Sequence, residues 1–81
     1  MRAELTEPFA DNLIVSPPEI QRLFGKQLAN LLRDIRHPSL RAKKLDPARG
    51  LWQARINDDG RFYFTIEGDR YVLHAITPHP K

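Results

Sequence analysis

The sequence has no cysteine, which excludes disulfide bridges, thiolate zinc sites and a cysteine nucleophile. No apolar run approaches the roughly 18 residues of a membrane-spanning helix, and the first residues lack a signal-peptide pattern. There is no Gly-rich phosphate-binding loop, and His37, His74 and His79 lack the spacing of metal ligands. These absences predict a cytoplasmic protein that needs no membrane, metal or other cofactor.

Positive charge is concentrated in the middle of the chain. Residues 33–57 contain seven Lys and Arg against two Asp, a net charge of +5, whereas residues 1–32 and 58–81 each carry a net charge of −1. Such a block is typical of a surface that binds a polyanion. A solvated basic rim or a binding site for an acidic partner segment would look similar.

The first half of the sequence predicts two helices. Thr6 or Glu7 could cap a helix over "TEPFADNLIV". For the second helix, Ser16 is the expected N-cap, and Glu19 has the capping-box spacing. Pro38 is expected to prevent its continuation. Six apolar residues then recur at helical intervals and predict one buried face: Ile20, Leu23, Phe24, Leu28, Leu31 and Leu32.

The second half predicts antiparallel strands. Apolar and polar residues alternate through "LWQARIN", "RFYFTI" and "YVLHAIT", a pattern typical of strands with one buried face. The core face of the third segment is expected to carry Tyr71, Leu73 and Ala75. We therefore predict an α+β fold in which a two-helix hairpin packs on a twisted antiparallel sheet.

The turns predict a register. "DDG" suits a three-residue loop with Gly60 in the left-handed conformation, and Gly68–Asp69 suits a two-residue loop. With the apolar residues on one face, the predicted neighbours on that face are Ile56–Phe62, Ala54–Phe64, Phe64–Leu73 and Ile66–Tyr71. On the opposite face, Arg55 is expected across from Tyr63, Tyr63 across from His74, and Arg61 beside Asn57 and Ile76.

These polar residues suit chemistry on RNA. An arginine can bind phosphate bidentately and stabilise transition-state charge, and histidine or tyrosine can transfer protons. A tyrosine can also stack on an unpaired base. The alternative is that the residues are polar only because they face solvent.

The stretch "RHPSLRAKKLDPARGLWQARINDDGRFYFTIEGDRYVLHAITPHP" resembles the RelE/ParE superfamily of bacterial toxins, and within it the RelE-like mRNA-cleaving branch. The resemblance lies in the order of "HPSLRAKKL", "GLWQAR", "RFYFTI", the "EGD" turn and the final "PH". It implies a single RelE-like domain over residues 1–81, with a helix hairpin on a sheet of three or four strands.

The resemblance also implies a function. Such a protein would be the toxin of a type II toxin–antitoxin system, a ribosome-dependent endoribonuclease that cleaves mRNA through metal-independent 2′-hydroxyl attack. Its partners would be a cognate antitoxin, the ribosome and mRNA, and it would form a homodimer or a toxin–antitoxin hetero-oligomer. Two alternatives remain open. One is a ParE-like toxin that acts on DNA gyrase, and the other is a catalytically degenerate module that only binds an antitoxin.

Site residues follow from the same resemblance. Arg61 matches the family's catalytic arginine, Arg55 lies on a strand that carries basic active-site residues, and His79 matches a position used in proton transfer. Tyr63 and His74 are the substitutes for that last role. The RNA-binding surface would comprise Arg36, Arg41, Lys43, Lys44 and Arg49.

Overall fold

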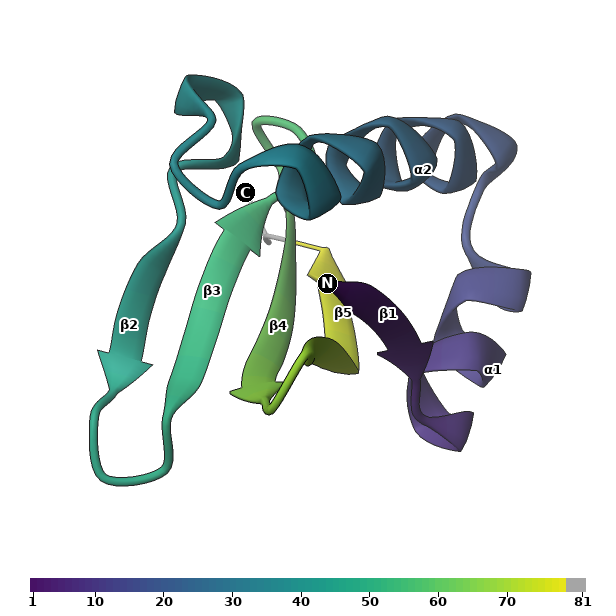
Figure 1. The fold of residues 1–81 in the computed structure, drawn as a ribbon. Helices are drawn as coiled ribbons and strands as arrows, with labels where there is room; N and C mark the ends of the chain where they lie inside the picture. Colours follow the sequence, from purple (N-terminus) through teal and green to yellow (C-terminus); the bar gives the residue numbers. More distant parts are fainter. Residues whose placement is uncertain (79–81) are drawn as a thin grey trace.

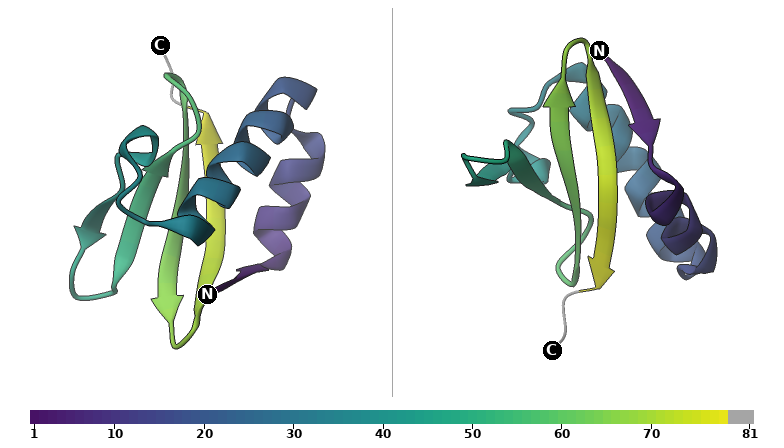
Figure 2. Two further views of the ribbon diagram at one scale, coloured as in Figure 1. Left: turned by 45° about the horizontal axis from the view of Figure 1, so that its top comes forward. Right: turned by 90° about the horizontal axis from the view of Figure 1, so that it is seen from below.

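The computed structural model describes residues 1–78, which form a five-stranded sheet and helices on one of its faces (Figures 1 and 2). In chain order the elements are β1 (Arg2–Leu5), α1 (Glu7–Val15), α2 (Pro18–Arg33), the 3₁₀ helix η1 (Pro38–Leu40), β2 (Lys43–Asp46), β3 (Leu51–Arg55), β4 (Gly60–Glu67) and β5 (Arg70–Pro78).

The strand order is β1-β5-β4-β3-β2, and β1 pairs with β5 in parallel while the other pairs are antiparallel. The predicted α+β fold is confirmed. The sheet has five strands, however, instead of the predicted three or four. Its two additional strands are the four-residue β1 and β2, which are too short to show a clear alternation in the sequence.

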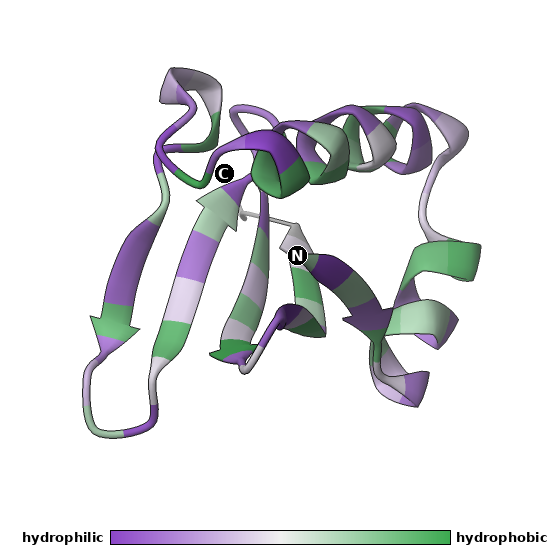
Figure 3. Ribbon diagram, viewed as in Figure 1, coloured by the Kyte–Doolittle hydropathy of each residue, from purple (hydrophilic) through white to green (hydrophobic). Residues whose placement is uncertain are grey.

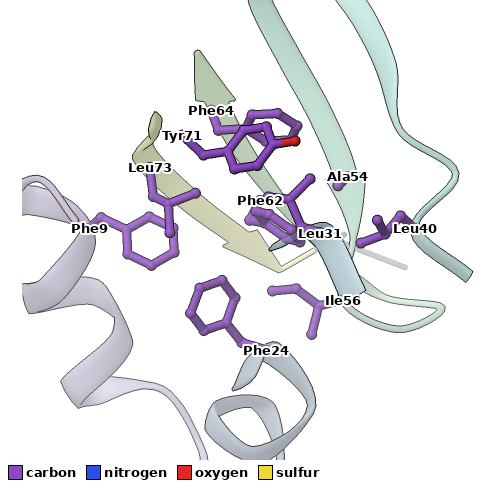
Figure 4. Packing of buried hydrophobic residues seen from close by; sticks show 10 residues of the cluster. All are labelled: Phe9, Phe24, Leu31, Leu40, Ala54, Ile56, Phe62, Phe64, Tyr71 and Leu73. Atoms are coloured by element: carbon purple, nitrogen blue, oxygen red, sulfur yellow. The ribbon is translucent and has the colours of Figure 1, made fainter. Parts of the chain in front are cut away.

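The core lies between the helices and the sheet (Figure 4). The Phe9 ring of α1 lies 5.1 Å from Phe24 of α2, which in turn lies 5.3 Å from Phe62 of β4. Burying each of these rings contributes about 1.5–3 kcal/mol to stability. Of the six residues predicted for the buried face of α2, five pack in or against this core, whereas Leu32 is exposed.

The helix starts confirm one predicted cap and correct the other. Thr6 caps α1, because its side-chain oxygen accepts from the Phe9 backbone N–H and its hydroxyl donates to the Leu73 carbonyl at 2.8 Å. Ser16 does not cap α2. It lies at the end of α1, where its hydroxyl donates to the Asn12 carbonyl. Because α2 begins so soon after α1, Pro17 becomes the N-cap of α2. It provides no side-chain hydrogen bond to the first turn.

The predicted register between β3 and β4 is wrong by two residues. Ala54 faces Phe62, and Arg55 faces Arg61 instead of Tyr63. The loop is wider than predicted because the Asn57 side-chain oxygen accepts from the backbone N–H groups of Asp59 and Gly60. Gly60 therefore does not adopt the predicted left-handed conformation.

The β4–β5 hairpin confirms its predicted turn. Gly68 has a φ of 62°, and Phe64 and Ile66 face Leu73 and Tyr71 as expected. Beyond this point a register shift between Tyr63 and Phe64 leaves His74 as an extra residue in β5, which is a β-bulge.

The bulge changes the partners of the last residues of β5. Tyr63 faces Ala75 instead of His74, and Arg61 faces Thr77 instead of Ile76. Ile76 consequently packs against the core, on the face where the sequence predicted Ala75.

Candidate functional site

Four cationic side chains line a depression on the sheet face opposite the helices. Its volume is about 330 Å³, and it is lined by Arg41, Lys43, Gln53, Arg55 and Arg61. Gln53 and Arg55 alternate along β3 with the buried Ala54, so their side chains leave the sheet on the side away from the core. None of these described lining residues is acidic. Figure 3 shows the hydrophilic start of β2 beside this part of the sheet.

Arg55 and Arg61 lie directly opposite each other and share an acceptor. Both donate to the Asn57 carbonyl, Arg55 through Nε at 3.2 Å and Arg61 through Nη1 at 2.7 Å. Arg61 also donates to the Gly60 carbonyl at 2.9 Å, and Arg55 forms an ion pair with Asp58. The loop thus holds two planar guanidinium groups in place, and such groups suit bidentate binding of a phosphate.

Asn57 organises this arrangement, although it was not among the site residues predicted from the sequence. Its side chain fixes the loop, and its carbonyl receives both arginines. An Asn at the start of "NDDG" is a known turn signal. That signal could have identified the loop, but not its contacts with the arginines.

Gln27 connects the two sides of the depression from within the protein. This side chain of α2 is 6% exposed. Its amide nitrogen donates to the carbonyls of Ser39 and Arg55 at 3.0 and 2.8 Å, and its oxygen accepts from Ser39 and Asn30. Arg41, two residues beyond Ser39, has a φ of 46°. Gln27 therefore ties the segment that carries this strained arginine to the backbone of Arg55.

The other predicted catalytic residues are Tyr63, His74 and His79, and neither Tyr63 nor His74 lines the depression. Tyr63 faces Gln53 across the β3–β4 pair, and its hydroxyl oxygen lies 3.3 Å from the Thr77 hydroxyl, which donates to it. His74 instead contacts Thr65, with 2.9 Å between Nε2 and Oγ1. Since the Thr65 hydroxyl donates to Glu67, the His74 Nε2 is the donor in this contact. His79 lies outside the described residues.

Three of the predicted RNA-binding residues do not line the depression. Lys44 lies over the Trp52 ring, 5.5 Å from its centroid, on the opposite face of the sheet from Lys43. Arg49 pairs with Asp46 in the β2–β3 turn at 3.6 Å. Arg36 is exposed in the segment after α2.

Residues 1–78 offer neither a metal site nor a membrane-spanning helix. No three His, Asp or Glu side chains in this range gather in a way that could hold a metal ion. No helix in this range has the length and apolar character needed to cross a membrane.

Comparison with known proteins gives matches in structure but not in sequence. No protein-family model and no curated protein matches the chain. A YoeB/ParE toxin from Agrobacterium tumefaciens matches with a TM-score of 0.82 and 17% identity, over 99% of this chain and 100% of that one. The YoeB dimer from Staphylococcus aureus matches with a TM-score of 0.81 and 13% identity, over 99% and 98%.

A chain from an archaeal complex also has this fold. The RelE–RelB complex from Pyrococcus horikoshii OT3 contains a chain that matches with a TM-score of 0.74 and 17% identity, over 99% of this chain and 96% of that one. These likenesses extend over nearly the full length of each chain. The RelE-like fold implied by the sequence resemblance is confirmed.

Proposed function

We propose that this chain, which has the fold of the RelE and YoeB toxins, is the toxin of a type II toxin–antitoxin pair and cleaves mRNA on the ribosome. The observation that carries the proposal is the depression, where Arg41, Lys43, Arg55 and Arg61 converge without a lining carboxylate. Four cations close together would attract the phosphates of a polyanion.

The proposed reaction uses the RNA's own 2′-hydroxyl as nucleophile. Its oxygen attacks the adjacent phosphorus, the bond from phosphorus to the 5′-oxygen breaks, and a 2′,3′-cyclic phosphate forms. Arg55 and Arg61 hold the scissile phosphate and stabilise the extra negative charge of the transition state. Loss of one such donor typically lowers the rate by about 10²–10³-fold. Arg41 and Lys43 hold the neighbouring phosphates.

Two protons must move in this reaction, one from the 2′-hydroxyl and one to the leaving 5′-oxygen. We assign proton transfer to His79, with Tyr63 and His74 as the alternatives. Of these two, Tyr63 faces Gln53 of the depression, whereas His74 is engaged with Thr65. The position of Tyr63 therefore favours it over His74.

The proposed partners are the ribosome, mRNA and a cognate antitoxin, met in the cytoplasm. Structural relatives support the antitoxin, because YoeB and YefM from Staphylococcus aureus form a heterotetrameric toxin–antitoxin complex and the archaeal RelE was crystallised with RelB. The YoeB dimer supports a homodimer as the alternative assembly. Arg36, Lys44 and Arg49 lie outside the depression and are assigned to contacts with ribosomal RNA.

Induced expression of wild type and Arg61→Ala tests the function, with pulse labelling of protein and DNA synthesis. Wild type should stop protein synthesis rapidly, and the variant should not. Arg61 is only partly buried and faces away from the core, so the variant should melt like wild type. Arg22→Ala, an exposed arginine of α2 paired with Glu19, should remain toxic.

Other outcomes would support the alternatives. Blocked DNA synthesis with continued translation would identify a gyrase poison. Normal growth with wild type would identify an inactive antitoxin-binding module. If translation stops, purified ribosomes programmed with mRNA should yield fragments that end in a 2′,3′-cyclic phosphate, and intact mRNA would contradict the proposed chemistry.

A further inference from the structure

Gln53 differs from the other residues that line the cationic depression. It is the one uncharged side chain among the five, and its amide makes no hydrogen bond with any described residue. By contrast, Gln21 donates to the carbonyls of Ile14 and Ser16, and Gln27 is fully engaged. The half-buried amide of Gln53 is therefore free to bond a ligand that the cations of the depression attract.

The register places an aromatic ring beside this amide. Gln53 faces Tyr63 on β4, while Arg55 faces Arg61 in the next row of the same face. These rows are two residues apart along each strand, or about 7 Å. The face thus has one row of guanidinium groups and, next to it, one row with an amide and a phenol ring.

The second row offers more than the binding of phosphate requires. Phosphate oxygens accept hydrogen bonds, so the cations satisfy them, whereas an amide both donates and accepts. The edge of a nucleobase also presents donors and acceptors, and an unpaired base can stack on an aromatic side chain. Amide and ring together match an unpaired base, and glutamine pairs bidentately with N6 and N7 of adenine.

We infer that Gln53 and Tyr63 form a base-binding subsite, which holds the adenine of the nucleotide whose phosphate lies against Arg55 and Arg61. Gln53 reads the edge of the base, and Tyr63 packs against its face. The inference rests on the proposed function, because it takes single-stranded RNA as the ligand. It adds a preference for sequence, which the arginines alone would not provide.

Binding of short RNA to the full chain tests the subsite by fluorescence anisotropy. The probes are labelled 2′-O-methyl hexanucleotides of A or U, which cannot undergo 2′-hydroxyl attack, and an abasic hexamer of equal charge. Wild type should bind the A probe about tenfold more tightly than the U probe, and the abasic probe most weakly.

Gln53→Met keeps the length of the side chain and removes the amide. It should abolish the preference for A, leave the abasic affinity unchanged and melt like wild type. Tyr63→Leu should weaken both base-bearing probes by about tenfold relative to the abasic probe, whereas Tyr63→Phe should retain binding. Arg61→Ala should weaken all three probes by a similar factor, because each carries the phosphates.

Several results would overturn the subsite. These are an unchanged preference for A in Gln53→Met, an equal loss on all probes in that variant, or no base preference in wild type. If wild type binds all probes equally and Arg61→Ala weakens them, the phosphate site of the proposed function stands and the base subsite fails. If wild type binds no probe, the base subsite is contradicted, whereas the ribosome-dependent function is decided separately by the assay on programmed ribosomes.

Discussion

At the scale of single residues, the arrangement of Arg55 and Arg61 depends on Asn57. Like charges directly opposite on neighbouring strands destabilise a sheet. Here the Asn57 carbonyl accepts from both guanidinium groups, and Asp58 pairs with Arg55. These contacts offset the repulsion and fix the direction of both side chains. The hairpin loop itself thus stabilises the two neighbouring cations.

Asn57→Ala should therefore weaken both the fold and the site. The backbone N–H groups of Asp59 and Gly60 lose their shared acceptor, and the free energy of unfolding should fall by about 1–3 kcal/mol. RNA affinity should fall with it. Urea denaturation and anisotropy measure the two effects. Asn57→Asp keeps the acceptor oxygen and should retain most of the stability, and equal losses in both variants would contradict this role.

Tyr71 should make stability depend on alkaline pH. Burial raises the pKa of its phenol above the ordinary value of 10.0, and the negative charge of Asp34 raises it further. The folded state therefore holds this proton more tightly than the unfolded state. Its contribution to stability is complete below the unfolded pKa and is lost as pH rises through the folded pKa.

Tyr71→Phe isolates this effect. Urea midpoints of wild type should fall as the pH rises above the ordinary tyrosine pKa of about 10. The variant should show a smaller fall, because other groups that titrate there are common to both proteins. Parallel pH profiles would show that Tyr71 titrates alike in the folded and unfolded states.

At the scale of secondary-structure elements, the two hairpins show what the sequence can predict. The β4–β5 turn has a glycine with positive φ at the expected position, and its first pairs were predicted correctly. In the β3–β4 hairpin the error was two residues. A shift of two keeps every side chain on its face, so the apolar alternation could not detect it. The observed register is held by the hydrogen bonds of Asn57 and by the backbone bond from the Ile56 N–H to the Gly60 carbonyl.

The site was predicted in part for related reasons. Arg41, Lys43, Arg55 and Arg61 were selected, and the structure brings them together. His74 was expected beside them, but a bulge in β5 moves it to Thr65, and a bulge leaves no mark in the apolar pattern. Gln27 was missed because it lies among the apolar residues of α2, where its role depends on carbonyls distant in sequence.

Replacing Gln27 should test the connection between α2, η1 and β3. In Gln27→Leu the partly buried carbonyls of Ser39 and Arg55 lose a donor, and stability should fall by about 2–4 kcal/mol. Gln21→Leu is a matched control on the same helix, because that glutamine is exposed, and it should cost less than about 1 kcal/mol. Thermal denaturation compares them, and similar losses would remove Gln27 from this role.

At the scale of the whole molecule, folding divides one block of positive charge between two faces of the sheet. Lys43 and Lys44 are adjacent in sequence, but the first lines the depression and the second lies over Trp52. The basic stretch therefore does not act as one surface. This separation provides two substitutions of equal charge with different expected effects.

Lys43→Ala should reduce the salt dependence of RNA binding, whereas Lys44→Ala should not. Each lost phosphate contact lowers the slope of log affinity against log salt by about 0.7 for a single strand. Anisotropy titrations of a free hexanucleotide at several salt concentrations measure this slope. Equal changes in both variants would mean that the oligonucleotide contacts both faces.

The parallel pairing of β1 with β5 also limits the order in which the protein can fold. Residues 2–5 pair with residues 70–73. The Leu73 carbonyl also accepts hydrogen bonds from the backbone N–H and the hydroxyl of Thr6. During synthesis β1 therefore cannot pair until β5, the last of the described elements, has been made. The β3–β4–β5 meander, whose contacts are local, can form before it. A chain arrested before Leu73 would leave β1 without most of its partner strand and Thr6 without its acceptor, so truncated translation products should not yield the finished sheet.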